Sequence, residues 1–598
     1  MISQFGPRLE PRGGVTFRLW APSAERVDLV INGPRPIEPQ PMERREEGWF
    51  VLSVPSAGPG TRYSFRIDGD LDVPDPASAF QPSDVDGPSE VIDHDYHWRH
   101  ADWRGRPWAE AVILELHVGT FTAGGRLRDV IDRLDDIAAA GITAIELMPL
   151  ADFPGRWNWG YDGVLWYAPD GCYGRPDDLR ALVDAAHARG LMVFLDVVYN
   201  HFGPEGNYLG RYARPFFTPA HRTPWGDAID YAVPQVRAFA IENALHWLMR
   251  YRFDGLRLDA VHALVEPDGL EMLRELSEAT GELAATSGRA IHLMLENDDN
   301  NTALLDPLKN PPQGKYRAQW NDDYHHAWHV LLTGEEIGYY RDYTADLRDL
   351  LARVMRSGFA YQGQSSTHRG GEPRGGSTDH LAPTAFVNFL QNHDQIGNRP
   401  FGDRLVTLAP DEAVAAALAV LLLAPMPPLL FMGEEWGARE PFPFFCDFKG
   451  DLGEAVRRGR RSEFEAHHLA VASTPGVDAL PDPLAEATFR SAVLDWTARA
   501  APAHRERLDL VRDLLAARRA YIVPRLGGLA RMQASASWTG PVLQVRWRLG
   551  DRSLGLLANL GTDPAARPRD WIRGVPIWGG APAEQLMSWQ VHWILGDA

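Results

Sequence analysis

The chain has few cysteines, no excess of basic residues and no long apolar run, and each absence argues against a class of protein. Cys172 and Cys446 are the only cysteines among 598 residues, so a disulfide scaffold is excluded and a reducing compartment fits. The formal net charge of −20 repels phosphate backbones, which argues against a nucleic-acid partner. The most apolar run, residues 413–424, is too short to span a bilayer, so we expect a buried helix and no membrane partner.

The remaining bulk properties are those of a large globular protein. The sequence is 45% hydrophobic and 23% charged, which supports an extensive core. The first 14 residues contain no apolar stretch of the kind a secretory signal needs, so we expect a cytoplasmic protein.

The two ends of the chain have the alternating pattern of β domains. Apolar and polar residues alternate in GVTFRLW (14–20), and we predict a β-sandwich over residues 1–92, followed by a linker over 93–109. Alternation returns in PVLQVRWRL (541–549), which predicts a small antiparallel β domain over residues 526–598.

Residues 110–525 instead alternate apolar, strand-like runs with amphipathic segments. Segments 127–141, 176–190 and 234–250 carry apolar residues at helical spacing. Such alternation favours a parallel sheet covered by helices, and eight units predict a (β/α)8 barrel, with an open doubly wound sheet as the alternative. The predicted strands are 111–117, 142–148, 191–198, 253–258, 291–295, 317–320, 385–390 and 428–432.

Two charged residues, Arg257 and Asp259, interrupt the apolar segment FDGLRLDAVH (253–262). Residues i and i+2 of a strand share a face, so both side chains point the same way at the carboxyl end of the fourth strand. Barrel enzymes keep their active sites at that end. The guanidinium favours the ionised form of Asp259, which could then act as a nucleophile, and a structural ion pair is the alternative.

Other predicted strands deliver polar residues to the same end of the barrel. Structural charges would scatter between both ends, so the convergence of the carboxylates Asp259, Glu296 and Asp394 predicts a catalytic rim. The full set that follows strands two, three, five and seven is Trp157, Trp159, Tyr161, Asp162, Asp196, Asn200, His201, Glu296, Asn392, His393 and Asp394.

Two facing carboxyl groups with unequal pKa values are what glycoside hydrolysis needs. Glu296 follows three apolar residues and has no cation beside it in sequence, so desolvation is expected to raise its pKa and suit it to donate a proton. A nucleophilic Asp259 implies a covalent intermediate, retained stereochemistry and carboxyl groups roughly 5–5.5 Å apart. A metal site is the rival interpretation, but the chain has no HExxH or His-x-His pair, so we expect no metal and no cofactor.

Four segments together resemble the signature segments of the α-amylase superfamily: DVVYNH (196–201), GLRLDAVH (255–262), LEND (295–298) and QNHD (391–394). The segment FRLWAPSAERVDLVI resembles the N-terminal module of branching and debranching members, which implies that residues 1–92 are like a carbohydrate-binding module.

Carried over residue by residue, the resemblance implies a role for each matching position. Asp259 would be the nucleophile, Glu296 the general acid/base and Asp394 the third carboxylate, which steadies the distorted sugar. Arg257 would keep the nucleophile ionised, while Asp196 and Asn200 would be structural. The sugar would be held by His201, His393, Tyr161 and the adjacent Asp162, and the leaving side of the cleft would be bordered by His262, Trp320, Asp322 and Tyr324.

The block QWNDDYHHA (319–327) is similar to superfamily members that cleave the α-1,4 bond next to the terminal trehalose unit of maltooligosyl trehalose, releasing trehalose. These members act after a maltooligosyltrehalose synthase, so a functional pairing with such a synthase is implied. A 1,4-α-glucan branching transglycosylase is the closest alternative, and a non-catalytic glycan-binding protein is the second. The basic cluster RRGRRSEF (457–464) is expected to be a solvated helix face.

Overall fold

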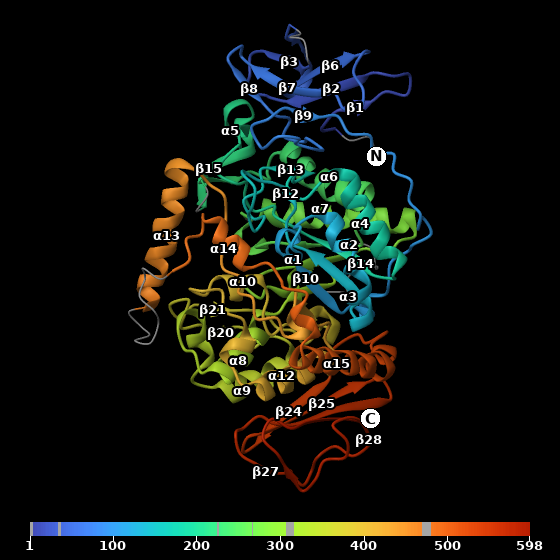
Figure 1. Ribbon diagram of the computed structural model, residues 1–598, viewed down its shortest axis with the longest axis vertical. Coiled ribbons are helices and arrows are strands. Elements are labelled where there is room, and N and C mark those ends of the chain that lie inside the picture. The colour runs from blue at the N-terminus through green and yellow to red at the C-terminus, as the bar shows by residue number, and fades with distance from the viewer. Residues whose placement is uncertain (1–3, 34–37, 224–225, 266, 306–315, 469–479) are drawn as a thin grey trace.

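A computed structural model describes residues 4–33, 38–223, 226–265, 267–305, 316–468 and 480–598. Figure 1 shows antiparallel sheets at the N-terminal end, a central barrel, and an antiparallel sheet at the C-terminal end, in that order along the long axis. This arrangement confirms the fold class that the sequence predicts.

The central barrel consists of eight parallel strands. Around the barrel they are β22 (Phe386–Val387), β19 (Ala318–Trp320), β18 (His292–Leu295), β17 (Gly255–Leu258), β14 (Met192–Val197), β11 (Ala144–Leu147), β10 (Ile113–Leu116) and β23 (Leu429–Phe431). The two ends meet where the amide of Leu429 donates to the carbonyl of Asn388 at 2.8 Å. Each strand falls within a predicted segment, so the barrel is confirmed and the open doubly wound sheet is wrong.

Helices cover the outer face of the barrel, which explains why its strands are mostly apolar. Every residue of β10, β11, β14, β17 and β18 is buried. The covering helices include α4 (Pro176–Ala188), α6 (Pro234–Arg250), α7 (Asp268–Ser287), α8 (Asp322–Thr333), α9 (Leu347–Ser357), α12 (Asp411–Leu423) and α15 (Pro502–Ala517).

Two helical predictions have different outcomes. Residues 413–423 of the apolar run lie in α12 and are almost all buried, and none of the described helices is long and apolar enough to cross a membrane. Where residues 127–141 predict one helix, the structure has α2 (Leu127–Ile131) and α3 (Leu134–Ala140). The amide of Arg133 bonds to the carbonyl three residues earlier at 3.0 Å, and this tighter turn separates the two helices.

The N-terminal part consists of two facing antiparallel sheets. The rings of Phe17 and Tyr63 meet between them with centroids 4.7 Å apart. From there the chain runs down one side of the barrel (Figure 1), where the indole N–H of Trp103 donates to Asp254 at 2.8 Å. The sheets are β1 (Arg8–Leu9), β2 (Val15–Trp20), β6 (Trp49–Val54) and β5 (Glu43–Arg44), facing β4 (Gln40–Pro41), β3 (Val27–Asn32), β7 (Arg62–Ile67), β8 (Leu71–Val73) and β9 (Ser89–Glu90).

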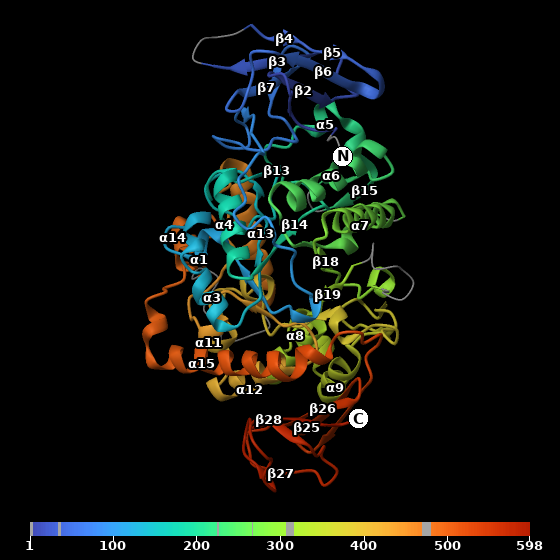
Figure 2. The same cartoon turned by 90° about the vertical axis from the view of Figure 1, so that its right-hand side faces the viewer.

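The C-terminal sheet packs against the barrel helices α9, α12 and α15 (Figure 2). Two stacked tryptophans, Trp547 and Trp593, have ring centroids 5.5 Å apart. Their indole N–H groups donate to the carbonyls of Met355 in α9 and Ala419 in α12, at 2.9 and 3.0 Å. The strands are β24 (Ala534–Thr539), β25 (Val542–Leu549), β26 (Arg552–Asn559), β30 (Val591–Asp597) and β28 (Val575–Trp578).

We expect Trp547→Ala to lower the free energy of unfolding by about 3–5 kcal/mol, because it removes a buried ring and leaves a cavity at this junction. Trp547→Phe keeps most of the ring and should cost about 1 kcal/mol for the lost hydrogen bond. Urea unfolding measures both, with Met587→Ala, at a side chain that is 57% exposed, as the control. Equal stability of Trp547→Ala and the control would contradict this role for the junction.

Candidate active site

The two candidate catalytic carboxyl groups follow neighbouring strands directly. β17 and β18 pair in parallel with Leu258 opposite Leu295, so Asp259 and Glu296 are the next residues on each strand. The amide of Asp259 donates to the carbonyl of Val197 at 3.0 Å, and that of Glu296 to Leu258 at 3.0 Å. The parallel hydrogen bonding therefore holds both residues side by side at the carboxyl end of the barrel.

One guanidinium lies between these carboxyl groups. Nη1 of Arg257 donates to Oδ1 of Asp259 and to Oδ2 of Asp196, both at 2.7 Å, while Nη2 lies 3.7 Å from Oε2 of Glu296. Burial alone would lower the pKa of Arg257, but the surrounding negative charges raise it well above its ordinary value. Arg257 therefore stays cationic and favours the ionised form of a carboxylate beside it.

The surroundings of Glu296 raise the pKa of its carboxyl group toward neutrality. Burial raises its pKa to about 7, with Arg257 opposing and the charges of Asp259 and Asp394 adding to the increase. The amide of Ala260 donates to its Oε2 at 2.5 Å, which leaves Oε1 to carry the proton. Ala260 has φ of 41°, a left-handed conformation that is rare for alanine.

The acidic run after Glu296 does not control its pKa. Asp298 pairs with Arg369 and Arg374, and Asp299 pairs with Arg369 as well. Their charges are thus balanced locally, and the pKa of Asp298 is lowered because these cations outweigh burial.

Two residues expected to be structural contact Asp259 and Arg257. The side-chain amide of Asn200 donates to Oδ2 of Asp259 at 2.9 Å and to its carbonyl at 3.1 Å. Asp196 accepts from Arg257 and from the hydroxyl of Tyr161, the latter at 2.6 Å. Burial raises the pKa of Asp196 to about 7. Asn200 and Arg257 together occupy both oxygens of Asp259 and orient it.

The aromatic part of the site is built from the second and seventh strands. The rings of Tyr161 and His393 are stacked with centroids 5.0 Å apart. His393 is fixed by Glu115 in β10, which accepts from its backbone amide at 3.1 Å and pairs with its Nδ1. Burial acts to lower the pKa of His393, but the charge of Glu115 raises it above its ordinary value. His201 is also beside Tyr161, with Nε2 2.9 Å from the Tyr161 carbonyl.

Asp394 is the most exposed of the three carboxylates. It lies at the start of α10 (His393–Gly397), where Oδ1 of Asn392 accepts its amide at 2.9 Å. Its Oδ1 accepts from the side-chain amide of Asn398 at 2.8 Å. Among the described residues this is the one hydrogen bond to its carboxylate.

The remaining predicted residues divide into two groups. His262 and Asp322 lie near the acid: His262 accepts from the amide of Asp298 at 3.3 Å, and burial together with the charge of Glu296 raises the pKa of Asp322. Trp320 and Tyr324 were expected to border the leaving side of the cleft, but their side chains are buried, at 1% and 0% exposed. Trp320 instead lies under Arg257, whose guanidinium carbon is 4.2 Å from its ring centre.

Asp162 is engaged in the local loop. Its carboxyl accepts from the side-chain amide of Asn158 at 2.7 Å, and burial raises its pKa.

Sequence reasoning missed Glu115, for which the signal was an acidic residue within an otherwise apolar strand. Within the described ranges, no group of three or more His, Cys, Asp or Glu side chains is placed to hold a metal ion.

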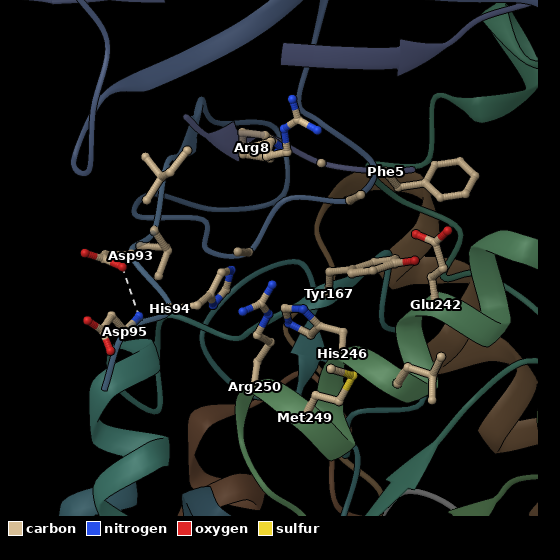
Figure 3. Close-up of a pocket in the computed structure, with 17 residues that line it drawn as sticks. Phe5, Arg8, Asp93, His94, Asp95, Tyr167, Glu242, His246, Met249 and Arg250 are labelled. Atoms are coloured by element: carbon tan, nitrogen blue, oxygen red, sulfur yellow. Dashed lines mark hydrogen bonds between the residues drawn. The ribbon is translucent and has the colours of Figure 1, made fainter. Parts of the chain in front are cut away.

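A cavity of about 600 Å³ lies elsewhere, between the N-terminal segment, the linker and α6 (Figure 3). Tyr167, His246 and Arg250 line it from the barrel side, while Arg8 lies on the N-terminal side. Asp259, Glu296 and Asp394 do not line this cavity. It is therefore separate from the catalytic rim.

Comparisons with known proteins identify the family of the chain. The α-amylase catalytic-domain family matches residues 77–218, and carbohydrate-binding module 48, the isoamylase N-terminal domain, matches residues 4–78. A crystal structure of a putative α-amylase from Salmonella typhimurium superposes with a TM-score of 0.93 and 41% identity, covering 100% of both chains.

Curated relatives are similar over nearly the whole chain. A malto-oligosyltrehalose trehalohydrolase of Deinococcus radiodurans is 43% identical, covering 92% of this chain and 88% of the relative. Another from Rhizobium sp. (strain M-11) is 40% identical, covering 93% of this chain and 95% of the relative. The chain therefore belongs to the malto-oligosyltrehalose trehalohydrolases of the α-amylase family of glycoside hydrolases.

Proposed function

We propose that the chain hydrolyses the α-1,4 bond next to the terminal trehalose unit of malto-oligosyltrehalose, with retention of configuration, and releases trehalose. The substrate follows from the relatives at 43% and 40% identity, which carry this activity in their names. The observation that carries the chemistry is the placement of Asp259 and Glu296 on paired strands around one buried guanidinium.

In the first step, a carboxylate oxygen of Asp259 attacks the anomeric carbon while the bond from that carbon to the bridging oxygen breaks. Glu296 gives its proton to that oxygen, so trehalose leaves as a neutral alcohol. In the second step, Glu296 takes a proton from water, the resulting hydroxide attacks the same carbon, and the ester to Asp259 breaks. The raised pKa of Glu296 supports the acid role, and the bonds from Arg257 and Asn200 support the nucleophile role.

The remaining residues would hold the sugar. Tyr161 is backed by His393 on one side of its ring, which supports a platform role for its other face. His201 and His393 would bond to the sugar hydroxyls beside this platform, and the exposed carboxylate of Asp394 would bond to hydroxyls of the distorted ring. His262 and Asp322 lie next to the acid and would border the leaving trehalose.

The proposal extends to the cellular setting. Cys172 and Cys446 are both free thiols, which supports a reducing, cytoplasmic location. A synthase that rearranges the reducing end of a maltooligosaccharide into a trehalose unit would supply the substrate, so we propose a functional pairing with it.

Asp259→Ala and Glu296→Gln are each expected to lower kcat by about 10³-fold or more, because each removes a group that acts only in the chemical step. Trehalose released from malto-oligosyltrehalose is measured by chromatography, with the exposed Glu278→Gln as the matched control. Near-full activity of either variant would contradict the assignment. Formation of α-1,6 branches without trehalose would favour the branching transglycosylase.

Retention has its own signature. In the first turnovers, proton NMR should show the new reducing end of the maltooligosaccharide as the α-anomer, before mutarotation mixes the two forms. Initial release of the β-anomer would mean direct attack by water and would remove Asp259 from the nucleophile role.

The raised pKa of Glu296 sets an expected pH dependence. Because the acid must be protonated, kcat/KM should fall through a pKa near 7, by about tenfold per pH unit on the alkaline side. Asp394→Asn removes a negative charge beside Glu296, so its residual activity should show the alkaline limb at lower pH. Circular dichroism over the same range separates titration from unfolding. A limb that begins only above about pH 9 would contradict this role for Glu296.

A further inference from the structure

One arginine of the basic cluster 457–464 is not on a solvated helix face. The cluster lies on α13 (Gly450–His468), where Arg458 and Arg461 are exposed as expected. The side chain of Arg460, in contrast, is only 17% exposed. Burial on this scale requires compensating contacts for its charge.

Arg460 makes those contacts with Glu463 one turn later on α13, whose Oε2 lies 3.2 Å from its Nη1, and with the end of α10. Nη2 donates to the carbonyl of Gly397 at 2.8 Å, and Nη1 donates to Oδ1 of Asn398 at 3.2 Å. The guanidinium carbon lies 5.1 Å from the ring centre of Phe444 and 4.8 Å from that of Phe464. The planar group is thus held by two aromatic rings while its N–H groups reach the catalytic rim.

The contact with Asn398 determines which way that side chain presents its amide. A guanidinium can only donate hydrogen bonds, so the atom of Asn398 that faces Arg460 must be the oxygen. The NH₂ group then faces Oδ1 of Asp394, to which it donates at 2.8 Å. Because the Asp394 carboxylate has no other hydrogen bond among the described residues, its orientation depends on this single amide.

We propose that Arg460 is a positioning residue that acts through Asn398 to orient the carboxylate of Asp394 toward the sugar at the cleavage site. This inference rests on the proposed role of Asp394 in the reaction. It assigns to α13, which follows the last barrel strand, a part in arranging the catalytic rim. Arg460 makes no hydrogen bond to Asp394 among the described residues, and the side-chain amide of Asn398 is the contact through which it would act.

Arg460→Ala should lower kcat on malto-oligosyltrehalose about 10–100-fold with little change in KM, since a misplaced group near the chemistry costs about that much. Arg460→Lys retains a hydrogen-bond donor but not the planar guanidinium with its several N–H groups, so its kcat should lie between those of the unmodified protein and Arg460→Ala. Arg461→Ala, one residue away on the exposed side of the same helix, is the matched control and should leave kcat unchanged. A loss in Arg460→Ala that appears in KM alone would overturn the proposal.

A double-mutant cycle separates positioning from support of α13. Asn398→Ala should cost about as much as Arg460→Ala, and the double variant should be no slower than Asn398→Ala, because both act on one chain of contacts. If the fold-losses in kcat of the two single variants multiply in the double variant, Arg460 acts independently of Asn398, and the proposal is overturned. Asp394→Asn separates the proposed function from the positioning role. Full activity of Asp394→Asn would refute the role of Asp394 in the proposed function. Loss of activity in Asp394→Asn, together with full activity of Arg460→Ala, would refute only the positioning role of Arg460.

Discussion

The catalytic rim depends on one buried cation, Arg257. Its guanidinium donates to Asp196 and Asp259 and lies over the ring of Trp320, while Glu296 is within 3.7 Å. A buried charge pair is costly to desolvate, and removing one partner typically costs about 3–5 kcal/mol because the other charge is left uncompensated. The arrangement therefore costs stability but fixes the geometry of the site: the guanidinium holds Asp196 and Asp259 by direct hydrogen bonds, while Glu296, farther away, has its pKa raised to about 7.

The interior of the barrel below this rim is unusually acidic for a core. Glu115, Glu146 and Asp196 are each about 1–2% exposed, yet they lie in strands whose other residues are almost all apolar. Burial, together with the charges of Asp196 and Glu115, raises the pKa of Glu146 well above its ordinary value. Glu115 keeps a separate task, since it orients His393. Local departures from the apolar strand pattern thus coincide with the functional end of the fold, as expected where a sequence serves chemistry rather than packing.

The barrel and the carboxylate pair could be predicted because both depend on local periodicity. Apolar runs place the strands, and the i, i+2 relation places Arg257 and Asp259 on one face. The remaining contacts could not be predicted from local patterns, because they join segments that are far apart in the sequence. Glu115 and His393 are 278 positions apart, and Asn398 and Arg460 are 62 apart. The expected position of Trp320 on the leaving side of the cleft differs from the structure for a related reason. A strand residue alternates between the barrel interior and its outside, and the pattern alone does not show that the interior position lies beneath a guanidinium.

The three carboxylates of the rim differ in how firmly they are held, and this difference agrees with their proposed tasks. Asp259 has a donor on each oxygen, from Arg257 and Asn200, and so has little freedom to rotate. Glu296 is anchored through one oxygen by the amide of Ala260, which leaves the other free to deliver and recover a proton. Asp394 is exposed and has one amide partner. A nucleophile must meet the anomeric carbon along one line, whereas a group that bonds to the hydroxyls of a ring changing shape must follow that change. A single, directional contact from Asn398, itself oriented by Arg460, meets that need: it sets the resting direction of Asp394 without fixing both of its oxygens.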